Sequence, residues 1–270
     1  MRKPILTLLA AVFLLSGEFA CTHRHDHDHD HHHHSRGMHP TMYATLYQQR
    51  AAEYQALCFQ AFNLASIQLQ NELKAGHNKP LAVVVDIDET VLDNSPYQAA
   101  GIAGGFGYPV RWNEWIDLAA AETVPGSLEF LLEAEIAGAE VFYVTNRKEE
   151  YREATLRNLR KKGFPFADDA HLLMRTDQPE KEIRRNFVRE RFEIAVLVGD
   201  NLGDFSEIFE TYDMEDRMQQ TIGRRNDFGK RWIVLPNAVY GNWVDVLPGY
   251  ERGLSDEALA DSLLKGLKGF

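Results

Sequence analysis

Apolar runs and segments of helical periodicity alternate through the middle and the second half of the 270-residue chain. Apolar residues at three- and four-residue spacing predict helices at 127–137, 149–162 and 180–191. Runs rich in β-branched and aromatic residues predict strands at 81–86, 140–145, 193–199 and 231–235. Because strands that alternate with helices form right-handed βαβ units, the pattern predicts an α/β fold with a parallel sheet.

Two further segments surround the first predicted strand. Residues 42–73 contain no Gly or Pro and repeat apolar residues at helical spacing, so we expect an N-terminal helical segment over 41–76, as one long or two short helices. Residues 97–124 are rich in Gly and aromatic residues and interrupt the alternation. They predict a small inserted cap that lies over the edge of the sheet.

The start of the chain has the pattern of a signal peptide at 1–20. A short basic start precedes an apolar run that is too short to span a membrane. Ala20 before Cys21 favours bacterial lipoprotein processing, in which Cys21 carries the lipid; ordinary secretion and an uncleaved anchor are the alternatives. We therefore expect an exported protein at the outer membrane or cell surface, or otherwise in the periplasm or secreted.

A His-rich linker at 21–40 follows this signal. Its core, HRHDHDHDHHHH, has no apolar residue and cannot fold by burial. Its imidazoles could capture Zn, Cu or Ni loosely, and the alternative is a solvated spacer. Nothing in the tract fixes a coordination geometry, so we do not expect a catalytic metal site there.

Charge and cysteine content narrow the class of protein. The formal net charge of -11 disfavours nucleic acid as the main partner, because phosphate contacts need Lys and Arg. Small anionic substrates need only a local positive site. The chain has two cysteines, so lipid on Cys21 leaves Cys58 without a disulfide partner. Cys58 lies on an apolar helical face and is expected to be a buried thiol.

Polar groups follow three of the predicted strands. They are, in chain order, Asp86 and Asp88, then Thr145, Asn146 and Arg147, then Asp200 and Asp204. Ligands of an open parallel sheet bind beyond the carboxyl ends of its strands. We therefore expect these groups to meet in one site.

The four aspartates of this set predict a metal. Carboxylates gathered in one pocket repel one another unless a cation offsets their charge. Since neither His nor Cys lies nearby in the sequence, oxygen ligands favour Mg²⁺ over Zn²⁺.

The remaining groups suit a phosphoryl anion. Thr145 and Asn146 can donate hydrogen bonds, and Lys181, before the third strand, adds a positive charge. One aspartate can attack phosphorus, and a second, two residues on, can protonate the leaving oxygen. A lone D-x-D is common in solvated loops. The prediction of phosphoryl transfer therefore depends on D-x-D-x-T, T-N-R and G-D-N-x-x-D following three strands in that order.

At these motifs the chain resembles the haloacid dehalogenase-like superfamily, and more narrowly the class C non-specific acid phosphatases, many of them bacterial surface lipoproteins. The resemblance lies in VVDIDETVLDNSPY at 84–97, FYVTNR at 142–147, VGDNLGDF at 198–205 and LPNAVYGNW at 235–243. It implies a Rossmann-like, doubly wound sheet and one phosphatase domain over 41–270. By analogy with relatives it also implies a homodimer.

The resemblance also implies roles for the acidic residues. Asp86 would be the nucleophile that becomes aspartyl-phosphate, and Asp88 the general acid and base. Mg²⁺ would be held by Asp86, the backbone carbonyl of Asp88 and Asp200, with Asp204 bracing the metal or its waters.

The other site residues receive roles in the same way. Thr145 and Asn146 would bind the phosphoryl oxygens, and Lys181 would neutralise them and orient the nucleophile. Tyr240 would lie near the leaving group, with core packing as the alternative.

Several neighbouring residues are interpreted as structural. Glu89 and Asp93 are expected to be helix-start acids that complement the helix dipole. Trp112 and Trp115 are expected to pack within the inserted segment. His77 and His171 have no evident partners in the sequence and are interpreted as non-catalytic.

The sequence therefore predicts an Mg²⁺-dependent acid phosphatase that hydrolyses small phosphomonoesters, with nucleoside 5′-monophosphates and nicotinamide mononucleotide as candidate substrates. Asp88 argues for hydrolysis, since a base must activate water. The alternative is a surface lipoprotein that binds metal or haem through its His-rich tract and carries a non-catalytic phosphatase fold.

Overall fold

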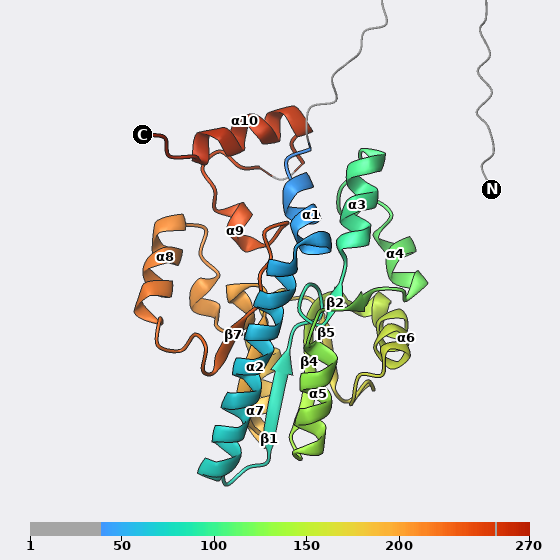
Figure 1. Ribbon diagram of the computed structural model, residues 1–270, viewed down its shortest axis with the longest axis vertical. Helices are drawn as coiled ribbons and strands as arrows, with labels where there is room; N and C mark the ends of the chain where they lie inside the picture. The colour runs from blue at the N-terminus through green and yellow to red at the C-terminus, as the bar shows by residue number, and fades with distance from the viewer. Residues whose placement is uncertain (1–38, 252) are drawn as a thin grey trace, which may run out of the picture. The chain divides into compact units, whose positions relative to one another are not determined.

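A parallel sheet of five strands forms the centre of the fold (Figure 1). The computed structural model describes residues 39–251 and 253–270. In the order of the sheet, the strands are β5 (Leu172–Arg175), β4 (Glu140–Lys148), β1 (Leu81–Val85), β6 (Glu193–Gly199) and β7 (Trp232–Val234). The predicted α/β fold with a parallel sheet is confirmed, and all four predicted strands are present.

β1 is the central strand and is buried along its whole length. Successive side chains of a strand point to opposite faces of the sheet. Val83 and Val85 accordingly join one apolar cluster, and Ala82 and Val84 join another on the other face. A strand that is covered on both faces has a continuous run of apolar residues, which is why the sequence of β1 predicts a strand so clearly.

Helices cover both faces of the sheet. On one face α2 (Ala52–Ala75), α5 (Ser127–Ile136) and α6 (Arg152–Lys162) contribute to the larger cluster, and Phe62 of α2 packs against Phe130 of α5 with ring centroids 5.8 Å apart. On the other face α7 (Glu182–Arg191) contributes Val188 to the second cluster. Helices on both faces are the doubly wound arrangement that the resemblance implied.

The N-terminal helical segment consists of two helices. α1 (Met42–Arg50) and α2 are separated at Ala51, whose ψ of 128° is extended rather than helical. Cys58, on α2, is fully buried, as its position on an apolar face predicted.

The inserted segment lies beyond the carboxyl end of β1 (Figure 1). A short antiparallel pair, β2 (Leu92–Asp93) and β3 (Glu122–Thr123), closes its base, and between them lie α3 (Ser95–Gly104) and α4 (Trp112–Leu118). Its own apolar cluster places Trp112 edge-on to Tyr97 at 5.0 Å between ring centroids. The expected packing role of Trp112 is therefore confirmed.

Several short elements are absent from the sequence prediction. They are β2, β3, β5, the 3₁₀ turns η2 (Leu202–Asp204) and η3 (Glu207–Phe209), and the helices α8 (Met214–Gly223), α9 (Asn242–Asp245) and α10 (Asp256–Gly266). Most are too short for hydrophobic periodicity to distinguish them from loops. The helix predicted over 149–162 is present, but it begins as a 3₁₀ turn, η1 (Glu149–Tyr151), and continues as α6.

Over the residues that the structure describes, no helix is long and apolar enough to cross a membrane. The predicted signal peptide, the lipidated Cys21 and the His-rich tract lie outside those residues. They stay predictions.

Candidate active site

The loop that follows β1 carries the first two aspartates. The backbone N–H of Asp86 donates to the carbonyl of Val198 at 3.0 Å, which ties the end of β1 to β6. Immediately afterwards the N–H groups of Thr90, Val91 and Leu92 all point at the carbonyl of Ile87. This tight turn, with Ile87 fully buried, fixes the positions of both aspartates relative to the sheet.

Three carboxylates converge where β1 and β6 end. Asp86, Asp200 and Asp204 each place an oxygen within 4.8 Å of the others. In the described part of the chain this is the one group of three or more His, Cys, Asp and Glu side chains that is close enough to hold a metal ion. The sequence prediction that these strand-end aspartates meet therefore agrees with the geometry.

Neutral donors anchor Asp200. Its Oδ2 accepts from Nδ2 of Asn237 at 2.8 Å, and its Oδ1 accepts from Oγ1 of Thr90 at 3.3 Å. Burial raises the pKa of Asp200 well above its usual value, and the charges of Asp204 and Asp86 raise it further.

Asp204 is anchored by the turn that contains it. Its Oδ2 accepts the backbone N–H of Asn201 at 2.9 Å, while the side chain of Asn201 caps the same 3₁₀ turn. A Cβ on Gly199 would lie 2.3 Å from Oδ2 of Asp204, far inside van der Waals contact. The glycine of the G-D-N motif is thus required for Asp204 to approach the end of β6.

Among the residues that the structure describes, one buried ammonium group contacts this cluster. Nζ of Lys181, at the start of α7, contacts Oδ1 of Asp86 and lies 2.7 Å from Oδ1 of Asp204. Burial alone would lower the pKa of Lys181, but Asp204 and Asp86 outweigh it and raise the pKa. Lys181 is therefore charged at neutral pH.

A single ammonium does not balance three carboxylates. Burial raises the pKa of Asp86 to about 7; Lys181 opposes the rise, and Asp204 and Asp88 add to it. A second cation would relieve this excess of negative charge. Carboxylate oxygens are the ligands of a hard cation such as Mg²⁺, so the donor set fits the predicted metal.

Asp88 lies beside this cluster but has different partners. Its Oδ1 accepts from Nη2 of Arg147 at 2.7 Å and from Nδ2 of Asn94 at 2.7 Å. The Asp88 carboxylate is not part of the three-carboxylate group. That its backbone carbonyl binds metal stays a prediction. Arg147, the last residue of the T-N-R motif, has no role in the sequence prediction.

Thr145 and Asn146, near the end of β4, are placed by a second arginine that the sequence analysis did not select. Arg184 donates to the carbonyl of Thr145 at 2.5 Å and to Oδ1 of Asn146 at 2.7 Å. Burial lowers the pKa of Arg184 to about 10, although the charge of Asp86 partly opposes this. Since Oδ1 of Asn146 is an acceptor here, its Nδ2 is left to donate elsewhere.

The expectation that Glu89 is a helix-start acid is wrong. Glu89 is fully buried, with a left-handed φ of 58°, and no helix begins at it. Its carboxylate accepts from the backbone N–H of Asn94 at 3.1 Å and contacts the hydroxyl of Tyr240. Burial raises the pKa of Glu89 to about 8, and Asp88 adds to the rise.

The contact with Glu89 also places Tyr240. This half-buried tyrosine comes from the segment after β7, yet its hydroxyl reaches the loop after β1. It therefore lies at the candidate site; its role towards a leaving group stays a prediction.

Two other expectations can be compared with the structure. Asp93 accepts from the N–H of Ser95 at 2.8 Å, at the start of α3, where a helix-start acid was predicted. His171 does have partners, contrary to the prediction, since its ring nitrogens lie 2.8 Å from Asp168 and 3.0 Å from Glu140. Asp168 lies three residues before His171 in the chain, whereas Glu140 meets it from the neighbouring strand β4, a contact that sequence spacing does not reveal.

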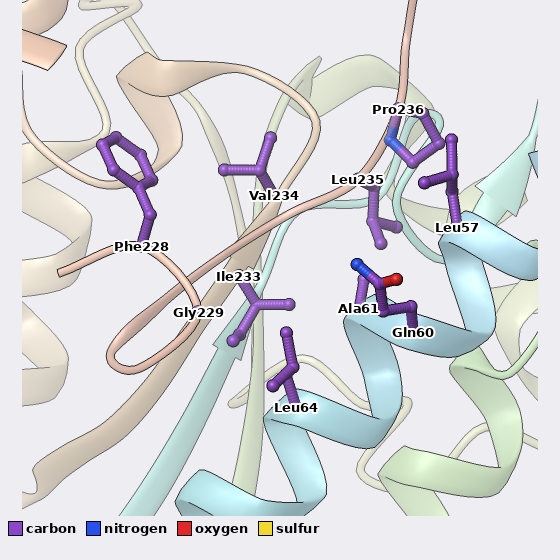
Figure 2. Close-up of a pocket in the computed structure, with 10 residues that line it drawn as sticks. All are labelled: Leu57, Gln60, Ala61, Leu64, Phe228, Gly229, Ile233, Val234, Leu235 and Pro236. Carbon is purple, nitrogen blue, oxygen red and sulfur yellow. The ribbon is translucent and has the colours of Figure 1, made fainter. Parts of the chain in front are cut away.

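An apolar hollow of about 270 Å³ lies elsewhere, between α2 and the chain around β7 (Figure 2). Its lining side chains, which include Leu57, Leu64 and Ile233, carry no charge. It shares no residue with the carboxylate cluster, so it offers none of the groups that phosphoryl chemistry needs.

Comparison with known proteins supports a common ancestry. The family model described as HAD superfamily, subfamily IIIB (acid phosphatase), matches residues 27–243. The class C acid phosphatase of Bacillus anthracis is similar with a TM-score of 0.82 and 38% identity, over 85% of this chain and 97% of that one. A structure of class C acid phosphatase from the same organism with tungstate bound is similar with a TM-score of 0.80 and 37% identity, over the same shares of the two chains.

A plant protein is similar over a shorter region. Acid phosphatase 1 of Solanum lycopersicum is 32% identical over 131 residues, which are 45% of this chain and 50% of that protein. The match thus spans about half the length of this curated relative.

Proposed function

The chain belongs to subfamily IIIB of the HAD superfamily, the acid phosphatases, and from this premise we propose that it is an Mg²⁺-dependent acid phosphatase for small phosphomonoesters. The observation that carries the proposal is the cluster of Asp86, Asp200 and Asp204 facing Lys181 at the ends of β1 and β6. Hard oxygen ligands and one fixed positive charge are what a metal-bound phosphoryl group requires.

The phosphoryl group would bind beside Asp86. Thr145 and the free Nδ2 of Asn146 donate to its oxygens, and Lys181 offsets its charge. A related class C enzyme has been solved with tungstate bound. Tungstate is a tetrahedral oxyanion like phosphate, which supports an oxyanion site in this fold.

Asp86 is the proposed nucleophile. One of its carboxylate oxygens bonds to phosphorus as the bond from phosphorus to the leaving oxygen breaks. The leaving oxygen keeps that electron pair and takes a proton from Asp88. Bound Mg²⁺ would supply positive charge that stabilises the phosphoryl oxygens.

Water completes the reaction. Deprotonated Asp88 removes a proton from water, whose oxygen bonds to phosphorus while the bond to Asp86 breaks. Inorganic phosphate leaves, Asp86 recovers its carboxylate, and Asp88 recovers its proton. Without a base at Asp88 the aspartyl-phosphate would persist, which is why the pair Asp86 and Asp88 favours a hydrolase.

Nucleoside 5′-monophosphates and nicotinamide mononucleotide are the proposed substrates to test first. Tyr240 supports this choice, because its hydroxyl is held by Glu89 at the site while an aromatic ring suits a planar leaving group. The N-terminal pattern supports the further proposal that Cys21 anchors the exported enzyme to a membrane.

Hydrolysis of p-nitrophenyl phosphate, with Mg²⁺ and with EDTA, tests the proposal. The assay should compare the full chain with residues 37–270, which form one compact unit. We expect both forms to turn over substrate and EDTA to stop both. Folded 37–270 that is inactive with Mg²⁺ would contradict the proposal. Metal or haem binding by the full chain alone would then favour the alternative, capture by the His-rich tract.

A further inference from the structure

The two oxygens of Asp88 have unequal surroundings. Oδ1 accepts from Nη2 of Arg147 at 2.7 Å, from Nε of Arg147 at 3.0 Å and from Nδ2 of Asn94 at 2.7 Å. Among the described residues, Oδ2 has one contact, with Nε of Arg147 at a longer 3.3 Å. One oxygen is therefore held by three donors, and the other is open to a further partner.

Arg147 is itself held in place. Its side chain is buried, its Nη1 donates to Oγ1 of Thr155 on α6 at 3.2 Å, and its guanidinium carbon lies 5.9 Å from the ring centroid of Trp112 on α4. These contacts use the planar fork of a guanidinium, which the single ammonium of a lysine does not reproduce. The direction from which Arg147 approaches Asp88 is thus set by the inserted segment and α6.

Asn94 is oriented by the same segment. Its Oδ1 accepts from Nε1 of Trp115 at 2.8 Å, and Nη2 of Arg147 lies 3.5 Å from that oxygen. Since Oδ1 faces these donors, Nδ2 must face the carboxylates, where it meets Asp88 and Glu89. Trp115 thus acts through a hydrogen bond as well as through packing.

We propose that Arg147 is the positioning residue of Asp88: with Asn94 it holds Oδ1, so that Oδ2 is the atom that exchanges the proton. This rests on the proposed function. Oδ2 gives its proton to the leaving oxygen as the bond from that oxygen to phosphorus breaks. It then takes one from the water that displaces Asp86. Oδ1 keeps its three hydrogen bonds in both protonation states, so the carboxyl does not rotate between the two steps.

The kinetic test uses the different needs of two leaving groups. p-Nitrophenolate departs as a stable anion, whereas the alkoxide of glycerol 2-phosphate needs a proton as it leaves. In Arg147→Gln, kcat/KM reports the first step and should fall about 10- to 100-fold for glycerol 2-phosphate but only about two- to threefold for p-nitrophenyl phosphate. The turnover number reports the shared second step and should fall equally for both, with a burst of p-nitrophenol.

Two comparisons and a control variant separate positioning from a structural role. In an Asp88→Asn background, Arg147→Gln should cause almost no further loss, because it acts through Asp88. Arg147→Lys keeps the charge without the fork and should show the same dependence on leaving group to a smaller degree. Arg152→Gln, at a guanidinium that binds Glu149 outside the site, is the matched control and should leave both rates unchanged.

The possible failures are distinguishable. Equal losses of kcat/KM on both substrates, or losses that add to those of Asp88→Asn, would overturn the inference and leave the proposed function intact. Full activity of Arg147→Lys on both substrates would also overturn it. Active Asp86→Asn, with no trappable phosphoenzyme in the wild type, would instead reject the proposed function. If Arg147→Gln does not fold, Arg147→Lys alone still decides the matter.

Discussion

Asp86 and Asp88 are two residues apart, yet they have opposite electrostatic environments. Asp86 is buried against Asp200 and Asp204 with one lysine for three carboxylates. Asp88 meets a guanidinium and a neutral amide, so its charge is matched within the chain. Asp86 therefore needs an added cation to offset the negative charge around it, whereas side chains of the protein alone offset the charge of Asp88 and fix its position. Loss of metal should therefore affect the environment of Asp86 far more than that of Asp88.

The largest expected effect is that of Asp86→Asn. An amide oxygen is a poor nucleophile, so we expect turnover of p-nitrophenyl phosphate to fall on the order of 10⁴-fold or more. Asp88→Asn should retain the nucleophile and accumulate phosphoenzyme instead. Acid quenching followed by mass spectrometry distinguishes the two variants. Near-normal rates in folded Asp86→Asn would rule out its assignment as nucleophile.

Sequence reasoning was most successful where burial acts on both faces. β1 and β6 have all or nearly all of their residues buried, so their sequences are uninterrupted apolar runs. β5 lies at the edge and alternates buried and half-buried residues over four positions, which is too short a pattern to recognise. The meeting of Asp86 with Asp200 followed from the sheet, because parallel strands end at a common edge.

The contacts that were not predicted depend on long side chains or unusual backbone. Arg147 and Arg184 act at the far end of flexible stems, and sequence spacing does not specify where those guanidinium groups lie. Glu89 has the position of a helix-start acid in the sequence, but its left-handed φ turns it into the interior. Its hydroxyl partner, Tyr240, is 151 residues away in the chain.

The next largest effect should come from Gly199→Ala. This variant tests whether the cluster of Asp86, Asp200 and Asp204 binds a cation. The new methyl would lie 2.3 Å from Oδ2 and 2.5 Å from Cβ of Asp204, so Asp204 must move away from Asp86. Strain of about 1–3 kcal/mol corresponds to a loss of roughly 5- to 150-fold in kcat/KM at limiting Mg²⁺.

A matched glycine makes that result interpretable. A Cβ on Gly223, at the end of α8, would meet nothing within 4 Å, so Gly223→Ala should behave as wild type. An Mg²⁺ titration of both variants is the measurement. Unchanged Mg²⁺ dependence in Gly199→Ala would show that Asp204 does not brace the metal.

A smaller effect is expected from Arg184→Gln, which concerns substrate binding. This variant loses the hydrogen bonds to the Thr145 carbonyl and to Asn146, so the amide of Asn146 is no longer oriented. We expect KM for p-nitrophenyl phosphate to rise about tenfold, the equivalent of about 1.5 kcal/mol, with little change in kcat. Arg189→Gln, farther along α7 and paired with Glu182, is the control. A fall in kcat at unchanged KM would place Arg184 in the chemical step instead.

The last expected effect is on stability rather than on rate, and it depends on the charge excess around Asp86. The pKa of Asp86 is about 7 in the folded chain and 3.8 in the absence of its surroundings, so between these values the folded state binds a proton that the unfolded state releases. This contribution to stability is complete below pH 3.8 and is lost as the pH rises through 7. Metal-free protein should therefore lose thermal stability from pH 5 to pH 7.5, about 2–4 °C for each kcal/mol. Mg²⁺ should restore more stability at the higher pH, and Asp86→Asn should make the profile shallower, leaving the part that Asp200 and Glu89 contribute. A metal-free profile as steep in Asp86→Asn as in the wild type would mean that the pH dependence comes from the other buried acids whose pKa is raised, Asp200 and Glu89, and not from Asp86.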